Sequence, residues 1–386
     1  MNIIIYTDYY PAPAEYNMPA DTHVIRYFAE KLMEKGHTVR VVRLFYRPLK
    51  ELRPGNAKFV LPRYADYEMN GIPVHLIRYQ MLEPKRTYPQ RFQAKMINRH
   101  LKKWKASLPY NADRVFVHFP TFFGGLDEIF NGTSAVMGDF HNIDVTVMRE
   151  RDKSGAARAF VQKLRVLGYR NNRVRDYLAA EFGSSGVTLH RVYTGIDSGM
   201  LAASDAVEAR KRASCGVLRV IYAGQLIPLK NVDILVQAVR KLDFETELVI
   251  VGDGEEMPRI RDLAGNDPRI RFTGWLEREK VTELMANADV LAMVSSPESY
   301  GMVYLEAMAK GTIPVAARGE GFDGIILDGE NGFLVQPRDI DALSRVLAAI
   351  RGLSAEDRAR LIENAYQTAC TLTEDKTTDL FLELNH

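Results

Sequence analysis

The chain of 386 residues contains only two cysteines, Cys215 and Cys370, which lie far apart in the sequence. Two distant cysteines argue against a disulfide framework and against a cysteine metal site. No apolar run approaches the ~20 residues that a membrane-spanning helix needs. The N-terminal sequence MNIIIYTDYYPAP has no Lys or Arg before its short apolar run, so we expect a first strand there and not a signal peptide. These absences favour a protein of the reducing cytoplasm.

Several binding signatures are also missing. No G-x-G-x-x-G follows the first predicted strand, which argues against a dinucleotide dehydrogenase. No recognised nucleic-acid-binding module is visible, so nucleic acid is not an expected partner. The D-x-D-like segment from Asp339 to Asp341 follows a predicted strand, and we interpret it as a helix cap. We therefore expect neither a metal ion nor another cofactor.

Charge is divided unevenly, although the net charge is only +2. Residues 1–200 hold 30 Lys and Arg against 19 Asp and Glu, whereas residues 201–386 hold 21 against 30. Two halves of opposite charge indicate separate units with different partners. A basic first half is suited to phosphates or to anionic lipid.

Short apolar runs alternate with segments of helical periodicity along the whole chain. In the first half we predict strands at 2–7, 38–44, 73–77, 114–118 and 134–138, with a helix at 21–35. In the second half we predict strands at 218–224, 247–254, 270–274, 289–295, 313–317 and 332–337, with helices at 231–241, 256–264, 279–287, 301–310 and 354–368. This alternation predicts an α/β protein with two doubly wound, Rossmann-like domains built on parallel sheets.

The predicted domains are an N-terminal domain of residues 1–200 and a C-terminal domain of residues 217–368. The polar segment 201–216 is interpreted as a linker, and residues 369–386 are expected to cross back to the first domain. Ligands of such sheets bind beyond the carboxyl ends of the strands, so we expect the site in the cleft between the domains.

The segment SSPESYGMVYLEAMAKG, residues 295–311, places Glu298 and Glu306 eight positions apart. Gly301 stands at the expected start of a helix, where unpaired backbone N–H groups form a phosphate site. Glu306 lies about one turn further on, where a carboxylate can accept hydrogen bonds from the vicinal hydroxyls of a ribose. The alternative is that Glu306 is an ordinary surface glutamate and that Glu298 only favours the helix start.

Two other strand ends in this half carry candidate donor-binding residues. The sequence YAGQLIPLKN places Gly224 and Gln225 after a strand and Lys230 at the start of the next helix, where it can hold a phosphate. The sequence VGDGEE places Gly252 and Gly254 where the backbone can approach a ligand closely. A solvated lysine and an ordinary tight turn are the alternatives, but the combination within one domain favours a nucleotide site.

With these residues the chain resembles the retaining glycosyltransferases of family 4, which have the two-domain GT-B fold. The resemblance is strong over about residues 218–340 and weaker before residue 200. It is carried by the family's E-x7-E motif from Glu298 to Glu306, the G-x-L-x-x-x-K block at 224–230, the glycines of VGDG, and GEGFDGIILDGENGFLV at 319–335.

The resemblance implies that a UDP- or GDP-linked sugar is the donor and that its sugar passes, with retention, to a glycan or glycolipid acceptor in cell-surface polysaccharide synthesis. It implies that Glu306 holds the donor ribose, that Glu298 contacts the transferring sugar, and that Lys230 neutralises the leaving diphosphate. The backbone N–H groups of Met302 and Val303 would bind the diphosphate or the sugar. No metal is implied.

In the first half, His118 in VHFP matches a family histidine near the transferring sugar, and His141 and Asp144 in HNID fall on the acceptor side. Without the family match, a single histidine after a strand is more often a structural residue. His141 and Asp144 could likewise only fix a loop.

The sequence departs from the family pattern at two places. Gln225 stands where the family usually has arginine, and YYPAPAEYNMPADTH, residues 9–23, replaces a loop that is often glycine-rich. Losing a cation near a diphosphate weakens its binding. Gln225 therefore leaves open a degenerate transferase that binds a nucleotide or a partner protein. A nucleotide-sugar epimerase of similar fold is a separate alternative, against which the E-x7-E block argues.

Residues 91–105, RFQAKMINRHLKKWK, are rich in Lys and Arg and contain no acidic residue. Ile97, Leu101 and Trp104 share one helical face, so this segment can form a basic amphipathic helix on an anionic membrane surface. The alternative is an ordinary helix that packs its apolar face on the first sheet.

Overall fold

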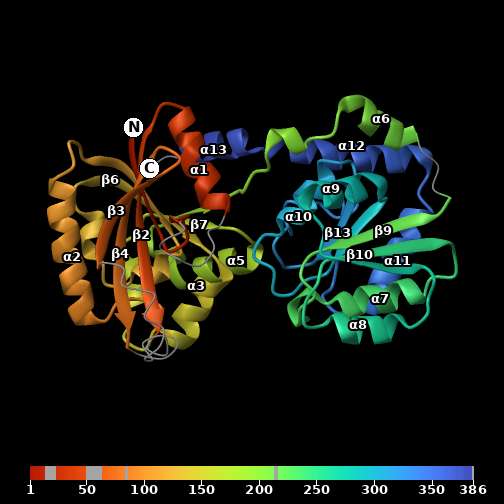
Figure 1. Ribbon diagram of the computed structural model, residues 1–386, viewed down its shortest axis with the longest axis horizontal. Coiled ribbons are helices and arrows are strands. Elements are labelled where there is room, and N and C mark those ends of the chain that lie inside the picture. Colours follow the sequence, from red (N-terminus) through yellow and green to blue (C-terminus); the bar gives the residue numbers. More distant parts are fainter. Residues whose placement is uncertain (14–22, 49–62, 83–85, 213–215, 385–386) are drawn as a thin grey trace. The chain divides into compact units, whose positions relative to one another are not determined.

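The computed structural model describes residues 1–13, 23–48, 63–82, 86–212 and 216–384. It divides the chain into two compact units (Figure 1). The first unit comprises Met1–Arg170, Val174–Tyr193 and the chain from Thr378 onward, and the second comprises Asn171–Arg173 and Thr194–Thr377.

The first unit is built on an eight-stranded sheet with the order β3-β4-β2-β1-β5-β6-β7-β8. All neighbouring strands pair in parallel except β3 and β4, which are antiparallel. The strands are β1 (Asn2–Thr7), β2 (Thr38–Pro48), β3 (Tyr64–Met69), β4 (Ile72–Met81), β5 (Ala112–His118), β6 (Thr133–Phe140), β7 (Val166–Tyr169) and β8 (Thr188–Arg191).

Both faces of this sheet are buried, as the apolar run of β1 requires. Ile4 and Tyr6 belong to one hydrophobic cluster and Ile3 and Ile5 to another, because successive side chains of a strand point to opposite faces. The first cluster includes residues of α2 (Arg91–Ala106), α4 (Ala156–Val161) and α5 (Asn172–Phe182), and the second includes residues of α1 (His23–Glu34) and Phe381 of α13 (Glu374–Glu383).

The second unit has a six-stranded parallel sheet with the order β11-β10-β9-β12-β13-β14, the doubly wound arrangement. Its strands are β9 (Leu218–Ala223), β10 (Thr246–Val251), β11 (Ile270–Gly274), β12 (Val290–Met293), β13 (Ile313–Ala317) and β14 (Phe333–Val335). Figure 1 shows α7 (Val232–Arg240) and α8 (Met257–Ala264) on one side of the sheet, with α9 (Arg278–Asn287) and α12 (Ala355–Thr371) on the other. The remaining helices are α3 (Asn142–Thr146), α6 (Ser204–Arg212), α10 (Met302–Met308) and α11 (Ile340–Arg351).

These two parallel-sheet units confirm the predicted fold class, but the predicted linker is wrong. Most of 201–216 forms α6, which packs on the second unit, and residues 213–215 lie outside the described residues. Val207 is buried, and the guanidinium group of Arg210 donates to the carbonyl oxygen of Gly311 at 3.2 Å. The sequence of this segment resembles a linker because α6 is held mainly by Arg210 and by the Lys211–Glu363 ion pair, with few apolar residues.

The sheet of the first unit also contains strands that the sequence did not indicate. The polar, half-exposed β3 pairs in an antiparallel direction with β4 at the edge, so the expected uniformly parallel pairing is wrong there. The predicted helix at 21–35 begins at His23 in the structure, and its first two positions lie outside the described residues, as do residues 14–22 of the unusual first loop.

Helix α2 has its apolar face turned to the sheet. Ile97 and Leu101 are 3% and 0% exposed, and Trp104 stacks on the His75 ring at 4.7 Å. The basic side chains of Arg91, Lys95, Arg99, Lys102 and Lys103 are exposed. The apolar face of α2 is therefore covered by the first unit itself.

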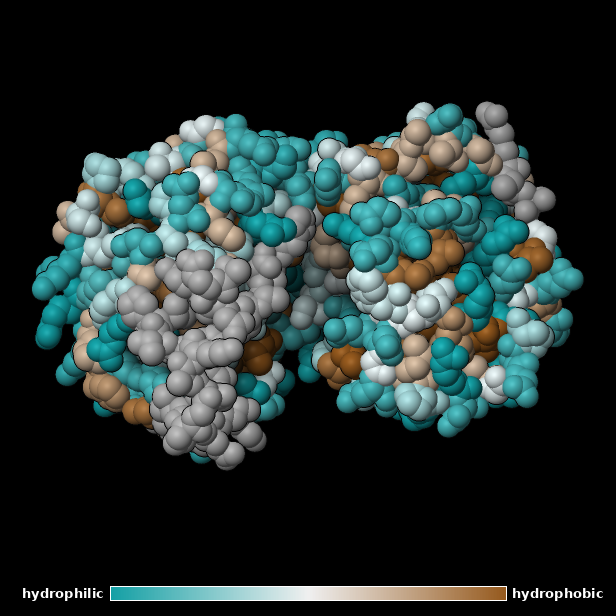
Figure 2. Space-filling model, viewed as in Figure 1, coloured by the Kyte–Doolittle hydropathy of each residue, from teal (hydrophilic) through white to brown (hydrophobic). Residues whose placement is uncertain are grey.

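Hydrophobic side chains on the face of the molecule seen in Figure 2 form small areas separated by hydrophilic residues. Within the described part of the chain, no helix combines the length and hydropathy that crossing a membrane requires.

We predict that Phe381 stabilises the first unit although it stands near the end of the chain. Its ring contacts Phe28 and Phe116 at centroid distances of 4.6 and 5.1 Å, so Phe381→Ala should lower the free energy of unfolding by about 3 kcal/mol. Urea unfolding in a Trp275→Phe background measures this, because Trp104 is then the only tryptophan and reports on the first unit.

The matched control is Leu380→Ala in the same helix, where the side chain is 39% exposed. This substitution should change the unfolding free energy by no more than about 0.5 kcal/mol. Equal effects of the two substitutions would contradict the predicted role of Phe381.

Candidate functional site

The predicted donor-binding residues of the second unit gather at the carboxyl edge of its sheet. Lys230 follows β9 and Glu298 follows β12, two neighbouring strands. The Lys230 Nζ atom lies 2.6 Å from Glu298 Oε2, and their side chains are 23% and 12% exposed. The loops that carry them are joined by a hydrogen bond from the Ser296 backbone N–H to the Leu229 carbonyl at 2.9 Å. The structure thus brings together the lysine and the first glutamate of the motif.

Two glycines allow the loops after β9 and β10 to touch through their backbones. A Cβ atom on Gly252 would lie 1.9 Å from the Gly224 carbonyl oxygen, and one on Gly254 would lie 2.3 Å from that of Leu226. Their φ angles of 126° and 159° are accessible mainly to glycine. The buried Tyr222 donates to the Gln225 carbonyl at 2.8 Å, while the Gln225 side chain is exposed.

Helix α10 begins after Gly301, which has a φ of 89°. A Cβ atom there would lie 2.5 Å from the ring of Tyr304, so a larger residue would displace that buried ring. Met302 and Val303 occupy the first turn, where backbone N–H groups have no partner within the helix. The predicted helix at 301–310 is shorter in the structure and ends at Met308.

Glu306, the second glutamate of the motif, is held by an arginine that sequence analysis missed. Arg278 Nη2 lies 2.9 Å from Glu306 Oε1, and the two side chains are 54% and 20% exposed. Arg278 stands at the start of α9, and only its position after a strand end could have suggested it. A ligand hydroxyl that approaches Glu306 must share this carboxylate with Arg278 or displace it.

A second missed residue, Glu320, fixes the loop that carries Glu298. Glu320 is 7% exposed, and its two carboxylate oxygens accept hydrogen bonds from the Ser296 hydroxyl and the Glu298 backbone N–H, both at 2.8 Å. The amide of Asn171 donates to the carbonyl oxygens of Ser299 and Glu298 at 3.1 and 3.3 Å. Glu320 therefore fixes the backbone position from which the Glu298 side chain extends. Its place in the GEGF segment was the available signal.

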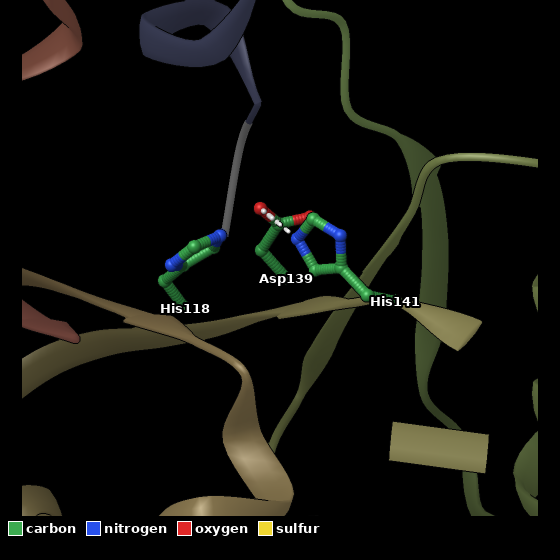
Figure 3. A group of neighbouring side chains, drawn as sticks. All are labelled: His118, Asp139 and His141. Carbon is green, nitrogen blue, oxygen red and sulfur yellow. Dashed lines mark ion pairs between the residues drawn. The ribbon is translucent and has the colours of Figure 1, made fainter. Parts of the chain in front are cut away.

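In the first unit, His118 and His141 lie with Asp139 at the carboxyl edge of the sheet (Figure 3). His118 ends β5 and is paired in register with Asp139 on β6. The Nδ1 atom of His118 lies 3.0 Å from the Thr7 hydroxyl, and the His141 Nε2 atom lies 3.5 Å from Asp139 Oδ2. Arg170 Nη2 binds Asp139 at 2.6 Å, and its Nε atom lies 3.1 Å from both carboxylate oxygens.

Asp144 has a structural position in the same loop. Its carboxylate accepts hydrogen bonds from the Thr121 backbone N–H at 3.1 Å, the Thr121 hydroxyl at 2.6 Å and the His141 backbone N–H at 2.9 Å. These contacts fix the loop that presents His141. Asp144 itself is fully buried.

Burial controls the ionisation of this group. It lowers the pKa of His118 well below its usual range, and the neighbouring His141 acts in the same direction. Burial alone would raise the pKa of Asp139, but the charge of Arg170 and the contact with His141 hold it below its usual range. His118 is therefore neutral and Asp139 charged at neutral pH.

Within the described residues, His118, Asp139 and His141 form a group that could hold a metal ion, since their ligand atoms lie within 4.8 Å of one another. Arg170 already binds both oxygens of Asp139, and a cation would have to displace this guanidinium group. The donor set therefore fits a carboxylate–arginine pair better than a metal. Asp339, of the D-x-D-like segment, accepts a hydrogen bond from the Ala342 backbone N–H at 2.8 Å and caps α11, as predicted.

Residues 209–368 match the family model described as "Glycosyl transferases group 1". Over this segment the chain is similar to the group 1 glycosyl transferases. The segment contains the predicted donor residues from Gly224 to Glu306.

Curated proteins that are similar to this chain include the lipopolysaccharide core biosynthesis glycosyltransferase LpsE of Rhizobium meliloti, 33% identical over 198 residues. That alignment covers 50% of this chain and 55% of LpsE. The GDP-mannose-dependent alpha-(1-6)-phosphatidylinositol monomannoside mannosyltransferase of Mycolicibacterium smegmatis is 31% identical over 209 residues, with 50% and 54% covered. The chain thus spans about half the length of these relatives.

Solved structures resemble the whole chain. Sucrose-phosphate synthase from Thermosynechococcus elongatus has a TM-score of 0.68 at 16% identity, covering 100% of this chain and 98% of its own. Anabaena HepE, in complex with UDP, has a TM-score of 0.67 at 18% identity, with 99% of both chains covered. These likenesses show the GT-B fold that the sequence resemblance implied.

We predict that Asp144 makes the first unit less stable as the pH rises. Burial raises the pKa of Asp144 to about 7. The hydrogen bonds from Thr121 and from the His141 backbone lower this pKa, but burial has the larger effect. This folded-state pKa exceeds the ordinary value of 3.8, so the folded state retains a proton that the unfolded chain releases. The stabilisation is complete below the unfolded pKa and is lost as the pH rises through about 7.

Asp144→Asn removes this titration. Thermal unfolding of the Trp275→Phe background with and without Asp144→Asn, followed by Trp104 fluorescence at several pH values, measures the difference. The midpoint of the Asp144 protein should fall relative to that of the variant between about pH 4 and about pH 7. Parallel pH profiles would show that Asp144 does not titrate in this range.

Proposed function

We propose that the chain is a retaining, metal-independent glycosyltransferase that moves a hexose from a UDP- or GDP-linked donor to a hydroxyl of a glycan or glycolipid. The observation that carries the proposal is the Lys230–Glu298 ion pair at 2.6 Å, which stands at the carboxyl edge of the second sheet beside the glycine-lined loops. The proposal includes a role in cell-surface polysaccharide synthesis and a cytoplasmic location.

In this mechanism the donor lies across the ends of β9, β10 and β12. Glu306 binds the ribose, the backbone N–H groups of Met302 and Val303 bind the diphosphate or the sugar, and Glu298 contacts the transferring hexose. Lys230 stabilises the negative charge that gathers on the departing nucleoside diphosphate. A fixed cation there lowers the energy of the transition state more than that of the bound donor.

Relatives and structural neighbours support a nucleotide-sugar donor. HepE was solved with UDP and with UDP-glucose, and one mannosyltransferase relative is GDP-mannose-dependent. The LpsE relative is named for lipopolysaccharide core biosynthesis, which supports a surface glycan as the acceptor. On the acceptor side we place His118 near the transferring sugar, with His141 and Asp144 around it.

A panel of UDP, GDP, UDP-glucose and GDP-mannose tests the donor site by thermal stabilisation. A ligand at about 100 times its dissociation constant should add about 2.7 kcal/mol to the stability. We expect stabilisation by the nucleotides of one base, and its loss in Glu306→Ala, because the ribose anchor is removed. The same stabilisation should persist in EDTA.

The control for Glu306→Ala is Glu283→Ala, which removes an exposed glutamate from α9 and should keep the stabilisation. No stabilisation by any nucleotide would overturn the proposal. Gln225 would then support a degenerate transferase that binds a partner. Stabilisation that disappears in EDTA and returns with manganese would refute metal independence.

We also propose that α2 brings the protein to an anionic membrane surface through charge alone. Ile97 and Leu101 are buried and cannot insert, whereas the exposed Lys and Arg side chains are each worth about 1 kcal/mol near an anionic surface. This contact would be peripheral and would keep the enzyme close to a glycolipid acceptor.

Vesicle co-sedimentation measures this contact. We expect binding to phosphatidylserine vesicles and not to neutral phosphatidylcholine vesicles, with release at about 0.5 M salt because the charges are then screened. The variant Lys95→Glu with Arg99→Glu should not bind. Equal binding to both vesicle types would contradict the proposed charge attraction. Binding that persists at high salt would indicate insertion into the membrane instead of charge attraction.

A further inference from the structure

Two histidines of the first unit meet where α2 packs on the sheet. His75 lies within β4 and His100 within α2, and their Nε2 atoms are 2.8 Å apart. The planes of the two rings differ by only 11°, whereas the ring centroids are 5.0 Å apart. The rings therefore meet edge to edge, with the two Nε2 atoms facing each other, and one N–H···N hydrogen bond joins α2 to β4.

Two aromatic side chains cover the faces of these histidines. Tyr64 of β3 stacks on His100 with a centroid distance of 3.5 Å and an interplanar angle of 5°. Trp104 of α2 stacks on His75 at 4.7 Å and 18°. His100 and Trp104 are four residues apart on α2, so they lie on the same face of the helix. The four rings thus connect α2 with both strands at this edge of the sheet.

The surroundings of His75 determine which of its nitrogens carries the proton. Its Nδ1 atom lies 2.7 Å from Asp66 Oδ1, and an ionised carboxylate only accepts, so Nδ1 is the donor. The Nε2 atom of neutral His75 is then an acceptor, and His100 donates to it. A further proton on His100 Nδ1 leaves this hydrogen bond intact. A proton on His75 Nε2 instead places two N–H groups against each other, because both Nε2 atoms are then donors.

Burial opposes the charged forms of both rings. It lowers the pKa of His75, which is 4% exposed, although the contact with Asp66 raises this pKa. Burial also lowers the pKa of His100, the charges of His75 and Lys103 act in the same direction, and the charge of Asp66 opposes them. Both pKa values lie below the ordinary value of 6.5. A state in which the rings are exposed to water therefore binds more protons than the packed state, and acid favours it.

The contact between the histidines is one of two polar contacts by which α2 is bound to β4. Near the start of the helix, Gln93 Nε2 donates to the Gln80 carbonyl oxygen at 2.6 Å. This amide contact does not titrate, whereas the histidine contact, two turns further along α2, does. Acid therefore acts on the C-terminal half of α2, where Leu101 is fully buried.

We propose that His75 and His100 form an acid-sensitive contact that holds the C-terminal half of α2 on the sheet at neutral pH and releases it when both rings are protonated. Release uncovers Leu101, whose burial in the packed state prevents α2 from inserting into lipid. The inference rests on the proposed membrane contact of α2 and makes pH its regulator. At neutral pH the helix binds through charge, and in acid its apolar face also takes part.

Acrylamide quenching of Trp104 fluorescence measures the release. The protein carries Trp275→Phe, so Trp104 is the only tryptophan, and no vesicles are present. Trp104 is stacked on His75 in the packed state and becomes accessible to acrylamide when the helix separates from the sheet. Between about pH 7.5 and about pH 4.5 we expect the quenching constant to rise about twofold or more, with its midpoint below the ordinary histidine value.

Three variants distinguish the histidine contact from general effects of acid. His100→Gln should lower the midpoint by about one pH unit, because an amide can donate to neutral His75 or accept from protonated His75. Asp66→Asn should raise the midpoint, because the charge that favours protonated His75 in the packed state is lost. The control is His190→Gln, which removes a partly buried histidine from β8 and should leave the midpoint unchanged.

Vesicle co-sedimentation measures the consequence for lipid. At neutral pH, about 0.5 M salt should release the protein from phosphatidylserine vesicles. At about pH 4.5 binding of the unmodified protein should persist at this salt concentration, because an apolar contact is not screened. His100→Gln should retain less binding under the same conditions, since less of it is released from the sheet.

Equal quenching of Trp104 at both ends of the pH range would overturn the proposal, and so would equal midpoints for the unmodified protein, His100→Gln and Asp66→Asn. Complete release from vesicles by salt in acid would also overturn it. Because the Asp66 side chain is 78% exposed, its variant keeps the test decisive if His100→Gln does not fold.

Failure of the proposed membrane contact is recognised separately. If the protein does not bind phosphatidylserine vesicles at neutral pH and low salt, that contact is contradicted. The quenching of Trp104, which is measured without vesicles, still decides whether the histidine contact opens in acid.

Discussion

Parallel pairing of the central strands is the constraint from which both sites arise. In a parallel sheet the carboxyl ends of all strands lie at one edge. Residues that follow different strands therefore become neighbours at this edge, although they are far apart in the sequence. In the second unit this edge unites Lys230 with Glu298, and in the first it unites His118 with Asp139. Strand β3, which runs antiparallel to β4, cannot contribute in this way, and it lies at the edge of the sheet.

The ion pairs at the two sheet edges differ in their exposure to solvent. The Asp139–Arg170 pair is almost fully buried, with side chains 0% and 4% exposed, and removing one partner would leave an uncompensated charge inside the protein. Because the guanidinium group of Arg170 contacts both carboxylate oxygens of Asp139, the pair holds a fixed position beside the two histidines. The Lys230–Glu298 and Arg278–Glu306 pairs retain more solvent exposure. Their charges can exchange partners with a ligand at a lower cost in free energy.

Sequence patterns predicted the strands whose apolar residues are continuous. A strand that is buried on both faces needs apolar side chains at successive positions, and this pattern is visible in the sequence. They predicted β1 and β13 with their observed bounds, and they placed the start of α10 within one residue of Met302. They missed β8, whose sequence TLHR is polar and short, and they took α6 for a linker.

At the site, strand ends and glycines were predictable because they depend on local backbone geometry. Glu320 and Arg278 were not, since their partners are 22 and 28 residues away and are fixed only by the folded loops.

The return of α13 to the first unit has a consequence for synthesis of the chain. Phe28 and Phe116 are translated before the second unit, but Phe381, against which both rings pack, is translated after it. Translation at ~5–20 residues per second separates the end of the first unit's main segment at Tyr193 from Phe381 by roughly 10 to 40 seconds. During that interval the face of the sheet beside α1 keeps an uncovered aromatic surface while the second unit is being made. The nascent first unit is therefore most exposed to chaperones and to aggregation in this interval, and a protein truncated before α13 would retain that surface permanently.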